Sequence, residues 1–186
     1  MCGINGVLAY RSNAPAVEKD EIVRVRDSMA MRGPDAAGLW LSDDGRVGFG
    51  HRRLSIIDLT PRGNQPMRSP DGRFTIVAKG EIYNYRELRS DLESKGYPFE
   101  STSDTEVILA MYARYGTAMF SKLRGMFGIA IWDSAERHLV LARGPMGIKP
   151  LYVSDDGGTL RFASQVKALL LLRGVDTRPD PAGHVG

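Results

Sequence analysis

The sequence predicts an α+β fold in which two antiparallel sheets stack and helices lie outside them. Three observations support this prediction. Short β-type runs fill much of the first half of the chain, separated by turn sequences such as Asp-Asp-Gly and Pro-Asp-Gly. Two helical segments follow, and a second block of short β-type runs comes after them. Strands, then helices, then strands is an order that suggests stacked sheets with helices on the outside.

The first block begins with a predicted strand over residues 1–10. A helix is predicted over residues 18–31, where Ile22, Val25 and Met29 form one apolar stripe. The turn Arg32-Gly33-Pro34-Asp35 ends this helix. β-Type runs then occupy residues 38–41, 46–50, 52–58 and 74–79. Runs this short, joined by turns, favour an antiparallel meander.

Two helices are predicted next, over residues 85–95 and 105–115. Gly96 and Gly116 follow them and suit the left-handed position after a helix. Ser103 and Glu106 have the spacing of a capping box before the second helix. The second block has β-type runs at 126–132, 138–142, 151–154 and 160–163, closed by a short helix to about Leu172.

The end of the chain resembles a linker. From Arg173 onward it contains the turn-forming residues Gly174, Pro179, Pro181, Gly183 and Gly186. At about 150 residues per domain, 186 residues predict one domain. We therefore expect a domain over residues 1–172 and a tail over 173–186.

Composition excludes several classes of protein. A single cysteine forms no internal disulfide, and the chain has no paired Cys-x-x-Cys spacing for structural zinc, so we expect no metal and no cofactor. The apolar segment from Ile4 to Tyr10 is too short to span a membrane, and no Lys or Arg precedes it as in a signal peptide. These features predict a cytoplasmic protein without a membrane partner.

The charge pattern argues against nucleic acid as a partner. The isoelectric point is about 9.1, but the 25 Lys and Arg interleave with the 22 Asp and Glu along most of the chain. The most basic stretch, Arg52-Arg53, is a pair and not a stripe. The chain also has no Gly-x-x-x-x-Gly-Lys-[Ser/Thr] loop for nucleotide phosphates.

The amino terminus offers a nucleophile. Cys2 follows the initiator Met, whose removal would leave a thiol and a free α-amine on one residue. The amine has a reference pKa of ~7.7 to 8.0, close to that of a thiol at ~8.5, so it can act as the base for the thiol. An ordinary structural cysteine is the alternative. A Cys–His pair would have to use His51, His138 or His184, and nothing in the local sequence marks any of them as a base.

Six ordered motifs favour the catalytic interpretation. They are Met1-Cys2-Gly3-Ile4, Arg32-Gly33-Pro34-Asp35, His51-Arg52-Arg53-Leu54-Ser55-Ile56-Ile57-Asp58, Gly80-Glu81-Ile82-Tyr83-Asn84-Tyr85, Ser103-Asp104-Thr105-Glu106 and Gly147-Ile148-Lys149-Pro150-Leu151-Tyr152. Together, over roughly residues 1–172, they resemble the class II glutamine amidotransferase domain of asparagine synthetases. The resemblance implies an N-terminal nucleophile fold, a four-layer αββα sandwich. It also implies hydrolysis of glutamine to glutamate and ammonia through a thioester on Cys2.

The resemblance also implies roles for other residues. Arg53 would grip the α-carboxylate of glutamine, a task that suits a planar bidentate guanidinium. Asp104 would accept the α-ammonium, and Glu81 would line the same pocket. Gly80 would offer its backbone N–H to the developing oxyanion. Arg32 would support the surroundings of the nucleophile.

The chain departs from the family pattern at several positions. Lys79 stands where the family has an asparagine that donates to the oxyanion, and losing such a donor typically costs ~10² to 10³ in rate. An ammonium could instead replace the lost N–H. Gly144 and Gln165 replace carboxylates of the family pattern, and Met31 replaces a histidine.

The synthetase domain of the family, with its Ser-Gly-Gly-x-Asp pyrophosphate loop, has no counterpart here. The resemblance therefore implies an ATP-dependent synthetase domain as partner, in the same or another chain. The leading hypothesis is an ammonia-producing glutaminase. The alternative, motivated by Lys79, Gly144 and Gln165, is a catalytically degenerate domain with a structural or interaction role.

Overall fold

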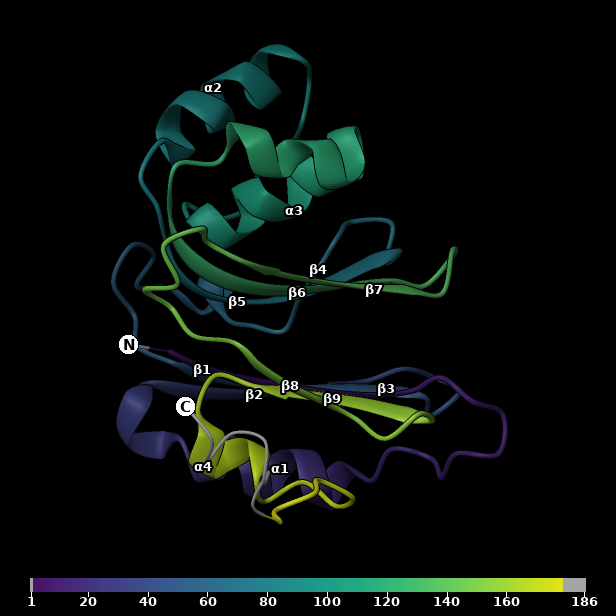
Figure 1. Ribbon diagram of the computed structural model, residues 1–186. Helices are drawn as coiled ribbons and strands as arrows, with labels where there is room; N and C mark the ends of the chain where they lie inside the picture. The colour runs from purple at the N-terminus through teal and green to yellow at the C-terminus, as the bar shows by residue number, and fades with distance from the viewer. Residues whose placement is uncertain (1, 179–186) are drawn as a thin grey trace.

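The chain forms four layers in the order helices, sheet, sheet, helices (Figure 1), as the α+β prediction requires. A computed structural model describes residues 2–178. In the first sheet the order is β2 (Ala36–Leu41), β3 (Val47–Arg53), β1 (Gly3–Ala9), β9 (Thr159–Ala163) and β8 (Tyr152–Asp155). In the second it is β4 (Met67–Arg68), β5 (Phe74–Ile82), β6 (Gly125–Asp133) and β7 (His138–Arg143). Neighbouring strands pair antiparallel in both sheets.

Helices cover the outer face of each sheet (Figure 1). The first sheet carries α1 (Lys19–Asp27) and α4 (Val166–Leu169), and the second carries α2 (Tyr85–Ser94) and α3 (Asp104–Tyr115). Short 3-10 segments lie at Ala30–Arg32, Pro61–Gly63 and Gly116–Lys122. Gly96 follows Lys95, the C-cap of α2, with a φ of +84°, as predicted, whereas Gly116 is itself the C-cap of α3, with φ +55° and ψ −143°, a positive-φ conformation that is not left-handed helical.

Three apolar clusters hold the layers together. The cluster between the sheets contains Ile4, Val47, Phe49, Val77, Ala130, Trp132 and Phe162. A second cluster lies between α1, α4 and the first sheet, and includes the predicted stripe Ile22, Val25 and Met29. The third packs α3 against the second sheet. Because each fully buried large apolar side chain contributes about 1.5–3 kcal/mol, these clusters dominate the stability of the sandwich.

Three strand predictions are wrong in their bounds. The runs predicted at 46–50 and 52–58 form one strand, β3, which ends at Arg53. β3 pairs with β1 up to Arg52 and with β2 up to Arg53, whereas residues 54–58 have no strand partner. Conversely, β5 continues beyond residue 79 to Ile82, because Gly80 adopts φ +117° within the strand.

The predicted capping box is also wrong. The Ser103 hydroxyl does cap α3, but it accepts from the Thr105 N–H at 3.1 Å. The Glu106 carboxylate accepts from the backbone N–H groups of Glu100 and Ser101, at 2.9 and 2.7 Å. The Ser103 N–H donates to the Ser101 hydroxyl instead, so Glu106 fastens the loop before the helix.

The beginning of the predicted tail contacts α1. Arg173 donates from its backbone N–H to Glu21 and pairs with Glu18 at 2.7 Å, and Val175 packs against the cluster beneath α1. The remainder of the tail, residues 179–186, lies outside the described residues. Within residues 2–178, no helix has the length and apolar character needed to cross a membrane.

Candidate active site

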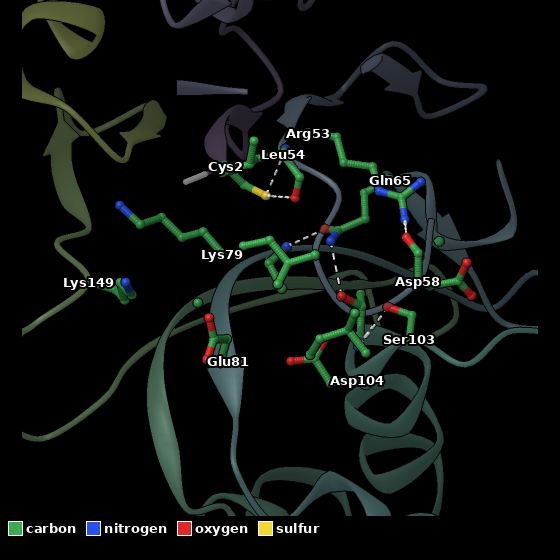
Figure 2. Close-up of a pocket in the computed structure, with 16 residues that line it drawn as sticks. Cys2, Arg53, Leu54, Asp58, Gln65, Lys79, Glu81, Ser103, Asp104 and Lys149 are labelled. Carbon is green, nitrogen blue, oxygen red and sulfur yellow. Dashed lines mark hydrogen bonds between the residues drawn. The ribbon is translucent and has the colours of Figure 1, made fainter. Parts of the chain in front are cut away.

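A cavity of about 260 Å³ lies where β1, β3, β5 and α3 meet. All six predicted site residues line it: Cys2, Arg53, Lys79, Gly80, Glu81 and Asp104 (Figure 2). The volume is slightly below the ~300–1,000 Å³ of typical ligand pockets, so the cavity suits a small molecule.

The pairing of β1 with β3 places Cys2 at the cavity. Gly3 lies opposite Arg52, which brings the residue before β1 next to the residues that follow β3. The Cys2 thiol donates to the Leu54 carbonyl at 3.6 Å, and the Leu54 N–H donates to the Cys2 sulfur at 3.4 Å (Figure 2). These two contacts fix the direction of the nucleophile.

The Cys–His alternative finds no support in the described residues. His51 lies on β3 between the sheets, 1% exposed, and burial lowers its pKa to about 3, so the ring is neutral. His138 is exposed at the start of β7, and His184 lies outside the described residues. Within residues 2–178, the hydrogen bonds of the Cys2 side chain go to Leu54 and none to a histidine.

Two carboxylates form the acidic end of the cavity. Asp104 begins α3, and one of its oxygens accepts the backbone N–H of Ile82 on β5 at 3.1 Å. Burial raises the pKa of Asp104, and the nearby Glu81 carboxylate raises it further, although the Ile82 N–H acts in the opposite direction. Two carboxylates that disfavour each other's charge would be stabilised by a cation such as an ammonium group.

Arg53 lines the cavity and also braces the adjacent loop. One terminal nitrogen of its guanidinium donates to the Thr60 carbonyl at 2.7 Å and to the Asn64 side chain at 2.8 Å. The other terminal nitrogen donates to the Asp58 carbonyl. Three of the five guanidinium N–H groups are therefore engaged, which leaves two for a substrate carboxylate.

Gly80 and Lys79 lie on β5 beside Cys2. A Cβ on Gly80 would overlap the Met126 carbonyl oxygen across the sheet, so the position requires glycine. Lys79 is 2% exposed, and its ammonium has no hydrogen-bond partner in the described residues. The pKa of Lys79 is lowered to about 8, mainly by burial and then by repulsion from Arg32 and Lys149. The Cys2 thiolate acts to raise this pKa.

Three further residues of the cavity were not singled out from the sequence. Asp58 joins two loops, because one oxygen accepts from Thr60 and the other accepts the Thr102 N–H at 2.8 Å. Burial alone would raise the pKa of Asp58, but these hydrogen bonds lower it to about 2. Gln65 donates to Thr105 and accepts from the Ala78 N–H, and Lys149 lines the cavity near Lys79. Asp58 and Lys149 lie within quoted motifs, and Gln65 lies in the sequence Asn64-Gln65-Pro66.

No cluster of three or more His, Cys, Asp or Glu side chains in residues 2–178 could hold a metal ion. What the cavity offers is a thiol at one end of a small pocket and two carboxylates at the other. A four-layer sandwich with a nucleophile in front of its first strand is the architecture of N-terminal nucleophile amidotransferases. Comparison with known proteins agrees.

The glutamine amidotransferase domain family matches residues 1–184, and the chain belongs to this family. The chain is 45% identical over 172 residues to asparagine synthetase [glutamine-hydrolyzing] 1 of Bacillus subtilis, covering 92% of this chain and 27% of that protein. It is 39% identical over 178 residues to amidase chry2 of Gibberella zeae, covering 91% and 26% of the two chains. It thus spans about a quarter of the length of these relatives.

The fold also matches a solved structure. Glutamine phosphoribosylpyrophosphate amidotransferase from Bacillus subtilis, complexed with ADP and GMP, superimposes with a TM-score of 0.78 at 22% identity. The match covers 91% of this chain and 43% of that chain. The chain is therefore an amidotransferase domain with the N-terminal nucleophile fold, and the comparisons give no support to the degenerate alternative.

Proposed function

We propose that this domain hydrolyses glutamine to glutamate and ammonia with Cys2 as nucleophile, for an ATP-dependent synthetase domain. The observation that carries the proposal is the placement of the Cys2 thiol at one end of a small cavity with Asp104 and Glu81 at the other. Glutamine has the matching polarity, with an amide at one end and an ammonium at the other.

The chemistry begins with removal of Met1, which frees the α-amine of Cys2. This amine takes the thiol proton, and the thiolate attacks the side-chain carbonyl carbon of glutamine. The α-ammonium of Cys2 then gives its proton to the amide nitrogen of the tetrahedral intermediate. The intermediate collapses to a γ-glutamyl thioester and releases that nitrogen as ammonia. A water molecule, deprotonated by the same amine, cleaves the thioester and returns the thiol.

Substrate binding uses both ends of the α-amino acid. The Asp104 carboxylate keeps one oxygen on the Ile82 N–H, and its other oxygen is assigned to the glutamine α-ammonium, with Glu81 adding negative charge. Arg53 is assigned to the α-carboxylate, through the N–H groups that do not brace the loop. Bracing the loop also restrains the guanidinium before the substrate arrives.

Oxyanion stabilisation is assigned to the backbone N–H of Gly80 and to Lys79. The φ of +117° at Gly80 turns the peptide at the cavity edge of β5, beside Cys2. Lys79 replaces a short amide donor with a flexible cation, which is harder to preorganise. We therefore expect catalysis to be retained but slower than with asparagine at this position.

The partner is inferred from the relatives. Proteins named asparagine synthetase continue well beyond the region matched by this chain, which supports a synthetase domain that receives the ammonia, in the same or another chain. We place the catalytic unit at residues 1–172 and assign residues 173–186 to the connection toward that domain. The cytoplasmic location stays a prediction from the sequence.

Ammonia release tests the proposal. Glutamine should yield stoichiometric glutamate and ammonia, and Cys2→Ala should abolish the reaction while leaving the circular dichroism spectrum unchanged. Cys2→Ser is the matched control, because it keeps a weak nucleophile of similar size and should leave only a trace of activity. Ammonia release that survives in Cys2→Ala would contradict the proposal.

A further inference from the structure

Two cationic side chains, Lys79 and Lys149, line the cavity with Cys2, and a third, Arg32, lies near Lys79. Arg32 ends the 3-10 segment after α1, Lys79 lies on β5, and Lys149 lies in the loop before β8. Arg32 and Lys149 are both close enough to repel the Lys79 ammonium. Among residues 2–178, the ion pairs of the structure include none of the three.

The Lys79 ammonium is the centre of this cluster. It is buried and has no hydrogen-bond partner in the described residues. Isolated buried cations are costly, and proteins nearly always pair them with an anion. Apart from the Cys2 thiolate, the described residues offer the Lys79 ammonium no anion, so a negatively charged group that enters from the cavity would be stabilised there.

The cavity is strongly polarised as a result. Figure 2 shows the ammonium ends of Lys79 and Lys149 on one side of the pocket and the carboxylate of Asp104 on the other, with Glu81 between Lys149 and Asp104. Cys2 lies at the cationic end. A ligand that complements both ends carries an ammonium at one end and an anionic group at the other, at the position where the Cys2 sulfur attacks.

Glutamate has this distribution of charge and glutamine does not. Both can present an α-ammonium to Asp104, but glutamate places a carboxylate where glutamine places a neutral amide. We propose that Lys79 and Lys149, with Arg32 adding positive charge near Lys79, form a carboxylate subsite that holds the side-chain carboxylate of glutamate, so that the domain retains its own product. This inference rests on the proposed function for the assignment of the α-ammonium to Asp104 and for naming glutamate as the product, whereas the carboxylate subsite itself does not depend on turnover.

Direct binding measurements separate this inference from catalysis. In a Cys2→Ala background, which prevents turnover, calorimetry gives the Kd of L-glutamate and of L-glutamine. Adding Lys79→Asn should weaken glutamate binding by at least 10-fold, because hydrogen bonds to charged groups are among the strongest, and should change glutamine binding less than threefold. Lys149→Gln should shift the ratio of the two Kd values in the same direction. Lys122→Asn, which removes an exposed lysine charge on the 3-10 segment after α3, should change neither.

The result that overturns the inference is a Kd ratio that changes less than threefold in both Lys79→Asn and Lys149→Gln. Binding of inorganic phosphate, measured in the same variants, tests the alternative that the subsite takes a free oxyanion. Phosphate that binds in a Lys79-dependent manner, with glutamate showing no such dependence, also overturns it. Because binding is measured without turnover, an inactive domain that selects glutamate through Lys79 contradicts the proposed function and leaves the subsite standing.

Discussion

Replacing Lys79 with methionine should stabilise the domain, because it removes a buried charge while keeping the unbranched stem. The pKa of Lys79 is lowered from 10.5 to about 8 by burial and by two neighbouring cations. A difference of about 2.5 units, at ~1.36 kcal/mol per unit, makes the charged form cost roughly 3 kcal/mol in the folded state. Relaxation around the shorter side chain reduces the gain, so we expect Lys79→Met to raise the free energy of unfolding by about 1–3 kcal/mol at pH 7.

The pH dependence identifies the cause. The folded chain releases the Lys79 proton near pH 8, whereas the unfolded chain holds it to about pH 10.5, so the penalty is full below pH 8 and disappears above pH 10.5. The advantage of Lys79→Met over the parent should therefore shrink as pH rises between these values.

Urea unfolding at pH 7 and pH 10, followed by fluorescence of the buried Trp132, measures both differences. The buffer must be free of glutamate, since a bound carboxylate would relieve the penalty. Lys122→Met serves as the control for removing an exposed lysine. A Lys79→Met variant that is no more stable than the parent at pH 7, or whose advantage stays constant to pH 10, would refute the reasoning.

Three other changes test two residues of the cavity, Lys79 and Asp58, and the buried His51 between the sheets. Lys79→Asn should raise kcat for glutamine by ~10-fold or more with little change in KM, because a short amide is a better preorganised oxyanion donor, and a lower kcat in steady-state assays would contradict this. Asp58→Asn should raise KM about 10-fold, because its side chain joins the loop braced by Arg53 to the loop before α3; Asp71→Asn, in the β4–β5 turn, is the control that should leave KM unchanged. The pKa of His51 is about 3 in the folded chain, against 6.5 for an ordinary histidine. Protonation of this buried ring should therefore lower the free energy of unfolding by up to ~5 kcal/mol as pH falls from 6.5 to 3. His51→Gln should flatten the fall of unfolding free energy over that range, and an identical slope would assign the acid sensitivity elsewhere.

Most elements of the sandwich could be predicted from the sequence, because turn residues and apolar periodicity are local properties. The errors occur where tertiary contacts decide. The predicted strand ends at residue 79 before Gly80, yet β5 continues because its pairing with β6 extends to Ile82 and Gly125, and only a glycine fits at position 80 so close to the Met126 carbonyl. The two-residue strand β4 is visible only through its pairing with β5.

In the candidate site, too, the residues in sequence motifs could be predicted, whereas the contacts made by tertiary packing could not. Five of its six predicted residues lie in ordered motifs, the sixth, Lys79, directly precedes one of them, and all six line one cavity. The bracing of the loop by Arg53 could not be predicted, because the guanidinium bonds two backbone carbonyls, and carbonyls leave no pattern in a sequence. The meeting of Arg32 with Lys79 and Lys149 likewise depends on how the loops between strands are packed.

Covalent labelling of the amino terminus tests the central claim most directly. An electrophilic analogue of glutamine should attach once per chain to a Cys2 from which Met1 has been removed, and intact-mass and peptide mass spectrometry should locate it there. Excess glutamine should protect the thiol, and Asp104→Asn should slow labelling by weakening the site for the α-ammonium. An N-terminal peptide that retains Met1 and carries no label would contradict the account.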